Sequence, residues 1–245
     1  MLGMDHNLFQ RPAATSTNVV LGAAAWLSSL QYFCVQWWVA SVWPRPYSPS
    51  MNFISDLGNT TCGTISGRMA RYICSPEHHW MNVSFTVLGL TTALGAIALR
   101  PRLMPGKLGL LSTSLFVASG IGVAMVGQNP ENLAVGRHIL GAYLNAFGAC
   151  FGVLLMGFAV RLKGRWPRFG TLNIMAGVIL LALALAENIG FYTQIPFFSL
   201  GLGQGGMEKL FDYMVYVWLI LVGAYLLIMQ TPDHPGGCGS PSDAA

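Results

Sequence analysis

The chain has 245 residues, of which 53% are hydrophobic and only 9% are charged, against roughly 25% charged residues in a typical soluble domain. This deficit excludes an ordinary water-soluble globule, because such a protein needs a charged surface around its core. The net charge of +4 comes from 13 Lys and Arg residues scattered between apolar runs, and without a basic stripe we expect no nucleic-acid partner.

Six apolar runs follow one another along the chain, each long enough to cross roughly 30 Å of hydrocarbon as a helix. They cover residues 18–43, 80–99, 108–127, 139–160, 170–189 and 211–230. The first run is too long for the core of a signal peptide, so we expect it to be retained. The sequence therefore predicts an all-α, polytopic membrane bundle of six transmembrane helices, with a membrane domain over residues 18–230.

The segments between the runs predict the orientation of the bundle. Basic residues are concentrated in the short loops at 100–107 and 161–169, which the positive-inside rule places in the cytoplasm together with both termini. Residues 1–17 then form a short cytoplasmic segment, and residues 231–245, rich in Pro, Gly and Ser, form a disordered tail. We expect a multi-pass protein of the cell membrane whose longer loops, which carry any chemistry, face outward.

The first outward loop, residues 44–79, contains two cysteines and two adjacent histidines. An oxidising exterior permits a disulfide between Cys62 and Cys74, but their spacing fits two unlinked thiols equally well and matches no zinc signature. His78 and His79 are more typical of a solvated helix start than of a metal site. The sequence therefore assigns no metal ligands and names no cofactor.

The distinctive polar side chains gather near the outward ends of the spans, where we expect them to line a lateral pocket. Candidate catalytic residues, which give or take protons, are Asp56, His138, Glu187, Glu208 and Asp212. Candidate substrate-binding residues, which offer amide or hydroxyl groups, are Asn52, Ser55, Asn82, Asn129, Asn145, Asn188 and Tyr216.

Two of these residues share one stripe of the fourth span. His138 and Asn145 are seven residues apart, two helical turns, so they project from the same face. Because polar groups at membrane depth are costly against hydrocarbon, that face must meet protein or water inside the bundle. The stripe serves either a buried hydrogen bond between helices or a functional site.

Two acidic residues lie one helical turn apart at the start of the last span. Glu208 and Asp212 repel each other when both are ionised, so either Lys209 or Arg137 compensates them or one carboxyl holds a proton, as a general acid requires. The alternative is a solvated acidic cluster at a helix N-terminus, where the helix dipole favours anions.

Three segments together form a recognisable pattern: Asn52-Phe53-Ile54-Ser55-Asp56-Leu57-Gly58, then Val126-Gly127 with Pro130 and His138, then Gly201-Leu202 with Gln204 and Glu208. The pattern resembles the prokaryotic membrane family catalogued as domain of unknown function nine hundred ninety-eight, and the likeness spans most of the chain. The resemblance implies a six-helix bundle but supplies no reaction.

The sequence leaves two functions open. One is an enzyme acting on a lipid or isoprenoid from the outer leaflet, either as a hydrolase with a metal-activated water or by terpene-cyclase-like acid chemistry starting from Glu187 or Glu208. The other is a non-catalytic lipid-binding or accessory membrane protein. An ion-coupled transporter is disfavoured, because the middles of the spans contain almost no ionisable residues. The oligomeric state stays open.

Overall fold

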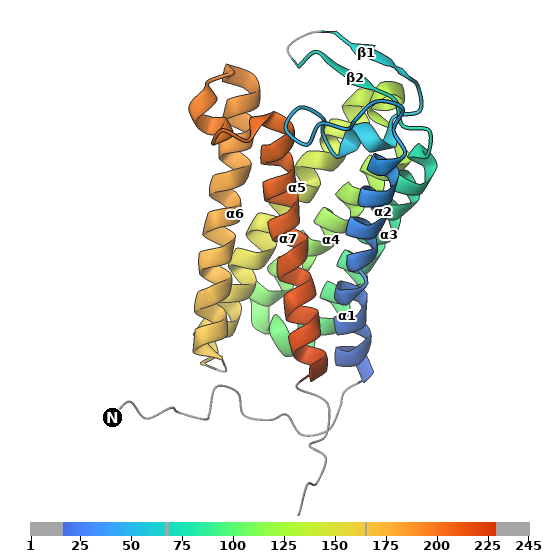
Figure 1. Ribbon diagram of the computed structural model, residues 1–245. Helices are drawn as coiled ribbons and strands as arrows, with labels where there is room; N and C mark the ends of the chain where they lie inside the picture. The colour runs from blue at the N-terminus through green and yellow to red at the C-terminus, as the bar shows by residue number, and fades with distance from the viewer. Residues whose placement is uncertain (1–16, 67–68, 165, 229–245) are drawn as a thin grey trace, which may run out of the picture.

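The structure is a computed structural model that describes residues 17–66, 69–164 and 166–228. Within these ranges, six helical segments are long and apolar enough to cross a membrane, and they form one bundle (Figure 1). The chain is therefore a multi-pass membrane protein, as its composition predicts. The expected tail at 231–245 and all but the last residue of the expected N-terminal segment lie outside the described residues.

The elements follow the predicted order. The first span consists of α1 (Thr17–Leu27) and α2 (Leu30–Ser41), and the other spans are α3 (His78–Leu103), α4 (Gly106–Gln128), α5 (Glu131–Leu162), α6 (Pro167–Thr193) and α7 (Gly203–Ile228). Between α2 and α3 lie the 3-10 helix η1 (Ser55–Gly58) and an antiparallel pair of short strands, β1 (Gly63–Ile65) and β2 (Arg71–Ile73). A second 3-10 helix, η2 (Pro196–Ser199), precedes α7.

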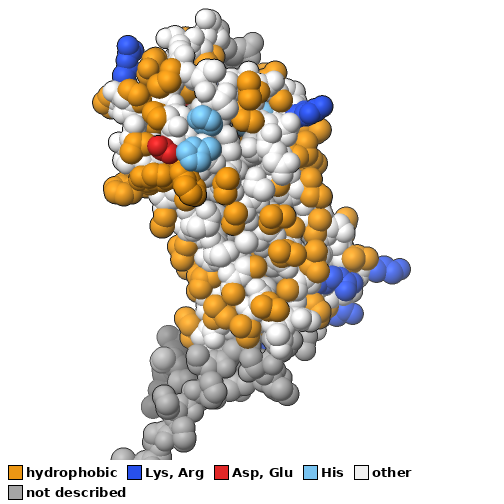
Figure 2. All heavy atoms as spheres, turned by 90° about the vertical axis from the view of Figure 1, so that its right-hand side faces the viewer, with side chains coloured by type: hydrophobic (Ala, Val, Ile, Leu, Met, Phe, Trp, Pro, Cys, Tyr) orange, Lys and Arg blue, Asp and Glu red, His pale blue; other side chains and the backbone are white. Residues whose placement is uncertain are grey.

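The two strands lie over one end of the bundle, which we call the hairpin end (Figure 1). A disulfide joins Cys62 to Cys74 beside the strands, which decides between the two alternatives that the spacing leaves open. The start of α1 and the end of α7 both lie at the opposite end of the bundle. Figure 2 shows one face covered by hydrophobic side chains along its length, with the charged side chains near its two ends, as a lipid-facing surface requires.

Two helices begin about two turns earlier than the apolar runs indicate. Helix α5 begins at Glu131 rather than at 139, and α7 begins at Gly203 rather than at 211. Their first turns carry polar side chains that face the interior of the bundle, so hydropathy alone underestimates their length. As a result, Glu208 lies within the last helix, in its second turn, together with Asp212.

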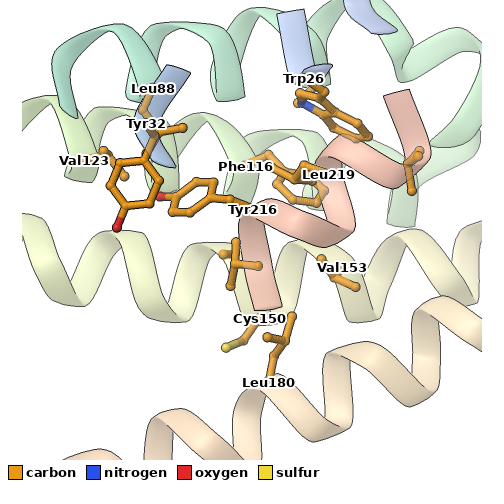
Figure 3. Close-up of a cluster of buried hydrophobic side chains, with 14 of the residues drawn as sticks. Trp26, Tyr32, Leu88, Phe116, Val123, Cys150, Val153, Leu180, Tyr216 and Leu219 are labelled. Carbon is orange, nitrogen blue, oxygen red and sulfur yellow. The ribbon is translucent and has the colours of Figure 1, made fainter. Parts of the chain in front are cut away.

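The core is built from large aromatic side chains packed against small residues (Figure 3). Trp26 of α1 is fully buried and its Nε1 donates to the carbonyl oxygen of Thr92 on α3 at 3.2 Å. A Cβ at Gly95 would lie 2.2 Å from Cδ1 of Trp26, so only glycine admits the indole there. The rings of Tyr32 and Tyr216 lie beside each other, 5.4 Å apart between centroids.

Small residues also set how closely the middle helices approach. A Cβ at Gly122 of α4 would lie 2.4 Å from the carbonyl oxygen of Gly141 on α5, so the two backbones approach closely only because both positions are glycine. Helices α5 and α6 are equally close at Gly157 and Gly170, far from the hairpin end. Figure 1 shows that these two helices diverge toward the hairpin end, and this divergence leaves room for a site.

Candidate functional site

A cavity of about 230 Å³ lies in the half of the bundle nearest the hairpin end, where α5 and α6 diverge. Side chains from α2 to α7 and from the loop before η1 line it. Eight of the sequence-predicted residues are in its wall: Ser55, His138, Asn145, Glu187, Asn188, Glu208, Asp212 and Tyr216. Eight of the polar residues that the sequence places at one end of the bundle therefore line one cavity.

Four predicted residues do not line this cavity. Asn82 of α3 donates through Nδ2 to the carbonyl oxygen of Gly58 at 2.9 Å, and Asn129 donates to the carbonyl oxygen of Met125 at 2.8 Å. Asn52 and Asp56 are buried in the loop above the cavity. All four make hydrogen bonds with backbone groups, and none of them lines the cavity.

Asp56 and Arg71 form a buried ion pair that ties η1 to β2. Nε and Nη2 of Arg71 donate to the two carboxylate oxygens of Asp56 at 2.7 and 2.6 Å, and Asp56 is fully buried. The backbone N–H of Phe53 and Nδ2 of Asn52 donate to the same carboxylate at 2.9 and 3.1 Å. We call Asn52, Asp56 and Arg71 the loop lock, because the oxygens of Asp56 are occupied by structural donors.

The loop lock also raises the pKa of Arg71. Burial lowers the pKa of Arg71, but the hydrogen bonds and the charge of Asp56 raise it by more, so the net pKa is raised. Nη2 of Arg71 further lies 3.6 Å from a carboxylate oxygen of Glu131 at the start of α5. The guanidinium thus joins the strand, the 3-10 helix and a transmembrane helix.

The start of α7 is fastened to the same loop through backbone groups. The N–H of Ile54 donates to Oε2 of Glu208, and Nζ of Lys209 donates to the carbonyl oxygens of Asn52 at 2.6 Å and Gly205 at 3.0 Å. Lys209 also lies over the ring of Tyr47, 5.0 Å from its centroid. Lys209 therefore fastens the loop by hydrogen bonds, and its charge also acts favourably on Glu208 and Asp212, which is the compensation that the sequence suggests.

Asn145 connects three helices beside the cavity. Its Oδ1 accepts hydrogen bonds from Ser119 of α4 at 2.9 Å and from the hydroxyl of Tyr216 of α7 at 3.0 Å. Its Nδ2 points to Oδ1 of Asp212 at 3.4 Å. Of the two roles that the sequence leaves open for this stripe, the buried hydrogen bond between helices is thus present at Asn145, and it also orients a cavity carboxylate.

His138 presents one ring nitrogen as an acceptor. Its Nδ1 lies 2.9 Å from the carbonyl oxygen of Asn129, and because a carbonyl only accepts, Nδ1 carries the proton. In the neutral ring Nε2 then holds a lone pair. Helix α5 is interrupted at Ala134, where φ is −147° and ψ is 56°, one turn before this histidine. The ring is buried in the cavity wall and is placed to take a proton from a ligand.

Glu187 and Asn188 come from α6, on the other side of the cavity. Nδ2 of Asn188 donates to the carbonyl oxygen of Ala184 at 2.8 Å, so this amide is partly engaged by its own helix. Within residues 17–66, 69–164 and 166–228, Glu187 has no hydrogen bond and no ion pair. Its carboxyl is therefore available to a ligand.

The cavity also contains tyrosines that sequence reasoning missed. Tyr32 of α2 is fully buried and lines the cavity, and its hydroxyl has no hydrogen-bond partner in the described part of the chain. Tyr143 of α5 and Tyr192 of α6 meet through their hydroxyl groups, 3.0 Å apart, across the divergence of the two helices. Tyr32 and Tyr143 lie in apolar runs and Tyr192 follows one closely, so nothing in the sequence distinguishes them from lipid-facing aromatics.

The arrangement suits proton transfer. Four carboxyl groups and an imidazole line one small space, and such groups act as general acids and bases when a substrate reaches them. Among the described residues, no group of three His, Cys, Asp or Glu side chains is placed to hold a metal ion. His78 and His79 instead contact Ser75 and Glu77 at the start of α3.

Comparison with known proteins identifies the family and no individual relative. No curated protein and no solved structure matches the chain. The family described as "Protein of unknown function (DUF998)" matches residues 14–225, a range that includes the first five spans, all but the end of the sixth, and every side chain that lines the cavity. The six-helix bundle, the motif around η1 and this match agree, and the chain belongs to the DUF998 family of membrane proteins.

Proposed function

We propose that the chain is a membrane enzyme that admits the polar end of a lipid or isoprenoid into the cavity and acts on it by proton transfer. One observation carries the proposal. Glu187, His138 and the pair Glu208 and Asp212 come from three helices that are distant in sequence, yet they line one cavity near the hairpin end. A bundle that needed polar residues only for folding would have no reason to leave the Glu187 carboxyl without a partner.

The edge of the cavity supports entry from the bilayer. Ile139 of α5 and Tyr192 of α6 are in its wall, and they are 44% and 56% exposed on the outside of the bundle. An opening between two transmembrane helices faces lipid. The proposed substrate therefore enters sideways between α5 and α6.

The size of the cavity limits what it holds. One water molecule occupies roughly 30 Å³ of the liquid. A cavity of about 230 Å³ therefore accepts a polar head and a few carbon atoms. Drug-sized ligands occupy pockets of about 300–1,000 Å³. A long apolar tail would thus stay between the helices or in the bilayer, which fits an amphiphile better than a water-soluble substrate.

The side chains suggest an acid–base mechanism. Glu187, free of other hydrogen bonds within the described residues, is placed to exchange a proton with the polar end of the substrate, and Nε2 of His138 is placed to accept one. This is closer to the terpene-cyclase-like chemistry than to the zinc-dependent hydrolysis considered above, because the described residues offer no three-ligand set. Asn145 would orient the carboxyl of Asp212, toward which its Nδ2 donates at 3.4 Å.

The test is turnover of native-membrane lipids by purified protein. Wild-type protein in nanodiscs is incubated with a total lipid extract, and substrate loss and product gain are followed by mass spectrometry. We expect Glu187→Gln to lower the conversion rate by about 100-fold or more, as loss of a general acid does. Its melting temperature should be unchanged, because Glu187 makes no hydrogen bond or ion pair within the described residues.

Glu77→Gln is the matched control, since it removes the same charge from a half-exposed site at the same end of the bundle. It should leave conversion unchanged. If the wild type converts no lipid although a stoichiometric lipid copurifies with it and is lost in Glu187→Gln, the protein is a lipid-binding protein and not an enzyme. Equal conversion by Glu187→Gln and wild type would contradict the proposed role of the cavity.

A further inference from the structure

The described lining of the cavity carries acidic side chains but no permanently cationic ones. Glu131, Glu187, Glu208 and Asp212 line it, and no Lys or Arg is found among the described lining residues. A recess lined by one sign of charge concentrates the opposite sign and repels its own. A ligand with a phosphate or carboxylate would meet carboxyl groups here and no Lys or Arg to pair with.

The nearest basic side chains are engaged elsewhere. Nζ of Lys209 is held by two backbone carbonyl oxygens at 2.6 and 3.0 Å. The guanidinium of Arg71 is paired with Asp56 and lies 3.6 Å from Glu131. Arg71 thus partly balances Glu131, whereas Glu187, Glu208 and Asp212 have no ion pair within the described part of the chain.

Aromatic rings make up much of the remaining wall. Phe53, Phe85, Phe191 and Phe211 line the cavity together with Tyr32 and Tyr216. The face of an aromatic ring carries a partial negative charge and attracts cations, more strongly where water is excluded. Carboxyl groups beside aromatic rings therefore favour a positively charged group with apolar substituents.

An independent observation concerns the hydroxyl of Tyr32. This side chain is fully buried, lines the cavity and has no hydrogen-bond partner among the described residues. Leaving a buried polar group unsatisfied is costly, so the hydroxyl marks a position where a ligand is expected. Its ring lies beside that of Tyr216 (Figure 3). An ammonium N–H would donate to the Tyr32 oxygen and to the carboxylates together.

We infer that the polar end held in this cavity is a protonated amine without a phosphate group, carried on an apolar tail. This inference rests on the proposed function, since it names the head of the amphiphile that the cavity admits. It selects long-chain amines over phospholipids, fatty acids and isoprenoid diphosphates. An amine supplied as a membrane lipid and one supplied as a free amphiphile present the same head to the cavity.

The test compares three amphiphiles that share a tail and differ only in the head. Dodecylamine, dodecanol and dodecyl phosphate are titrated at neutral pH into the full-length protein in phosphatidylcholine nanodiscs, and bound ligand is counted by native mass spectrometry. Empty nanodiscs correct for partition into lipid. Dodecylamine, whose amine is protonated at this pH, should bind about tenfold or more tightly than dodecanol, and dodecyl phosphate more weakly still.

Three variants test whether the cavity is the source of the selectivity for the amine. Glu187→Gln should weaken dodecylamine binding by about tenfold while leaving dodecanol binding nearly unchanged, because only the ammonium loses a charged partner. Tyr32→Phe should weaken dodecylamine by a smaller factor. Glu77→Gln, outside the cavity, should change neither ligand.

The source of the amine is distinguished by repeating the titration with a sphingoid base in place of dodecylamine. Tighter binding of the sphingoid base indicates a lipid headgroup, and equal binding indicates that the amine alone is recognised. Binding of dodecanol or dodecyl phosphate as tight as that of dodecylamine overturns the inference but leaves an amphiphile site in place. If none of the probes binds above empty nanodiscs, the amphiphile site of the proposed function fails as well.

Discussion

Arg71 holds more of the hairpin end together than any other single side chain described above. It satisfies both oxygens of Asp56, approaches Glu131, and lies 4.5 Å over the ring of Phe53, which lines the cavity. Its raised pKa contributes stability that is complete below the pKa of the unfolded chain and is lost only as pH rises through the still higher pKa of the folded state. The loop lock is therefore insensitive to pH in any ordinary buffer.

We predict that Asp56→Asn strongly destabilises the protein. The substitution leaves Arg71 buried with an uncompensated charge, and breaking a buried pair in this way costs about 3–5 kcal/mol. The free energy of unfolding, measured by denaturant titration in detergent micelles, should fall by that amount. Asp56→Asn combined with Arg71→Met should recover part of the loss, because both charges are then removed. If the single variant is as stable as wild type, the loop lock does not support the fold.

At the scale of elements, the hairpin end depends on fastenings rather than on its own secondary structure. A two-stranded pair such as β1 and β2 is marginally stable in isolation. The Cys62–Cys74 disulfide and the Arg71–Asp56 pair hold it in place over the bundle. Below it, α4 and α5 meet through glycines, and this contact fixes the helix that carries His138 and Asn145.

We predict that Gly141→Ala separates α4 from α5. The new Cβ would lie 2.7 Å from the carbonyl oxygen of Gly122 and 3.0 Å from Cβ of Met125, so backbone must shift. Overpacking of this kind costs about 1–3 kcal/mol, measurable as a lower free energy of unfolding. Gly136→Ala, five residues earlier in the same helix, meets no atom within 4 Å and should be neutral or slightly stabilising. Equal effects of the two variants would rule out close packing as the reason for glycine at 141.

For the whole molecule, we propose that the hairpin end faces outward and both termini face the cytoplasm. The disulfide at that end and the basic loops at the other support this orientation. In a background with Cys34 and Cys238 replaced by serine, Ser50→Cys in the outward loop should react with a membrane-impermeant maleimide on intact cells. Lys163→Cys, exposed between α5 and α6, should react only after the cells are opened. The reverse pattern would invert the proposed topology.

Much of this molecule is predictable because lipid imposes simple rules. Apolar runs locate all six spans, and the cost of polar groups in hydrocarbon correctly places His138 and Asn145 in the interior. The sequence does not reveal contacts between side chains that are distant along the chain. Nothing periodic links Asp56 to Arg71, so the sequence does not reveal that this carboxylate is buried against a guanidinium. Tyr32 lies within an apolar run and gives no sign that its hydroxyl reaches the cavity.

Because α5 and α6 diverge, the potency of any compound that enters the cavity between them depends on its concentration in the bilayer. Such a compound reaches the protein from the bilayer, so the relevant concentration is its mole fraction in lipid and not its concentration in water. Potency measured against the aqueous dose would then rise with the partition coefficient even where contacts with Tyr143, Glu187 and Tyr192 are identical. Lengthening a tail by one methylene, worth about 0.8 kcal/mol of transfer, would look like improved recognition while leaving the true affinity unchanged.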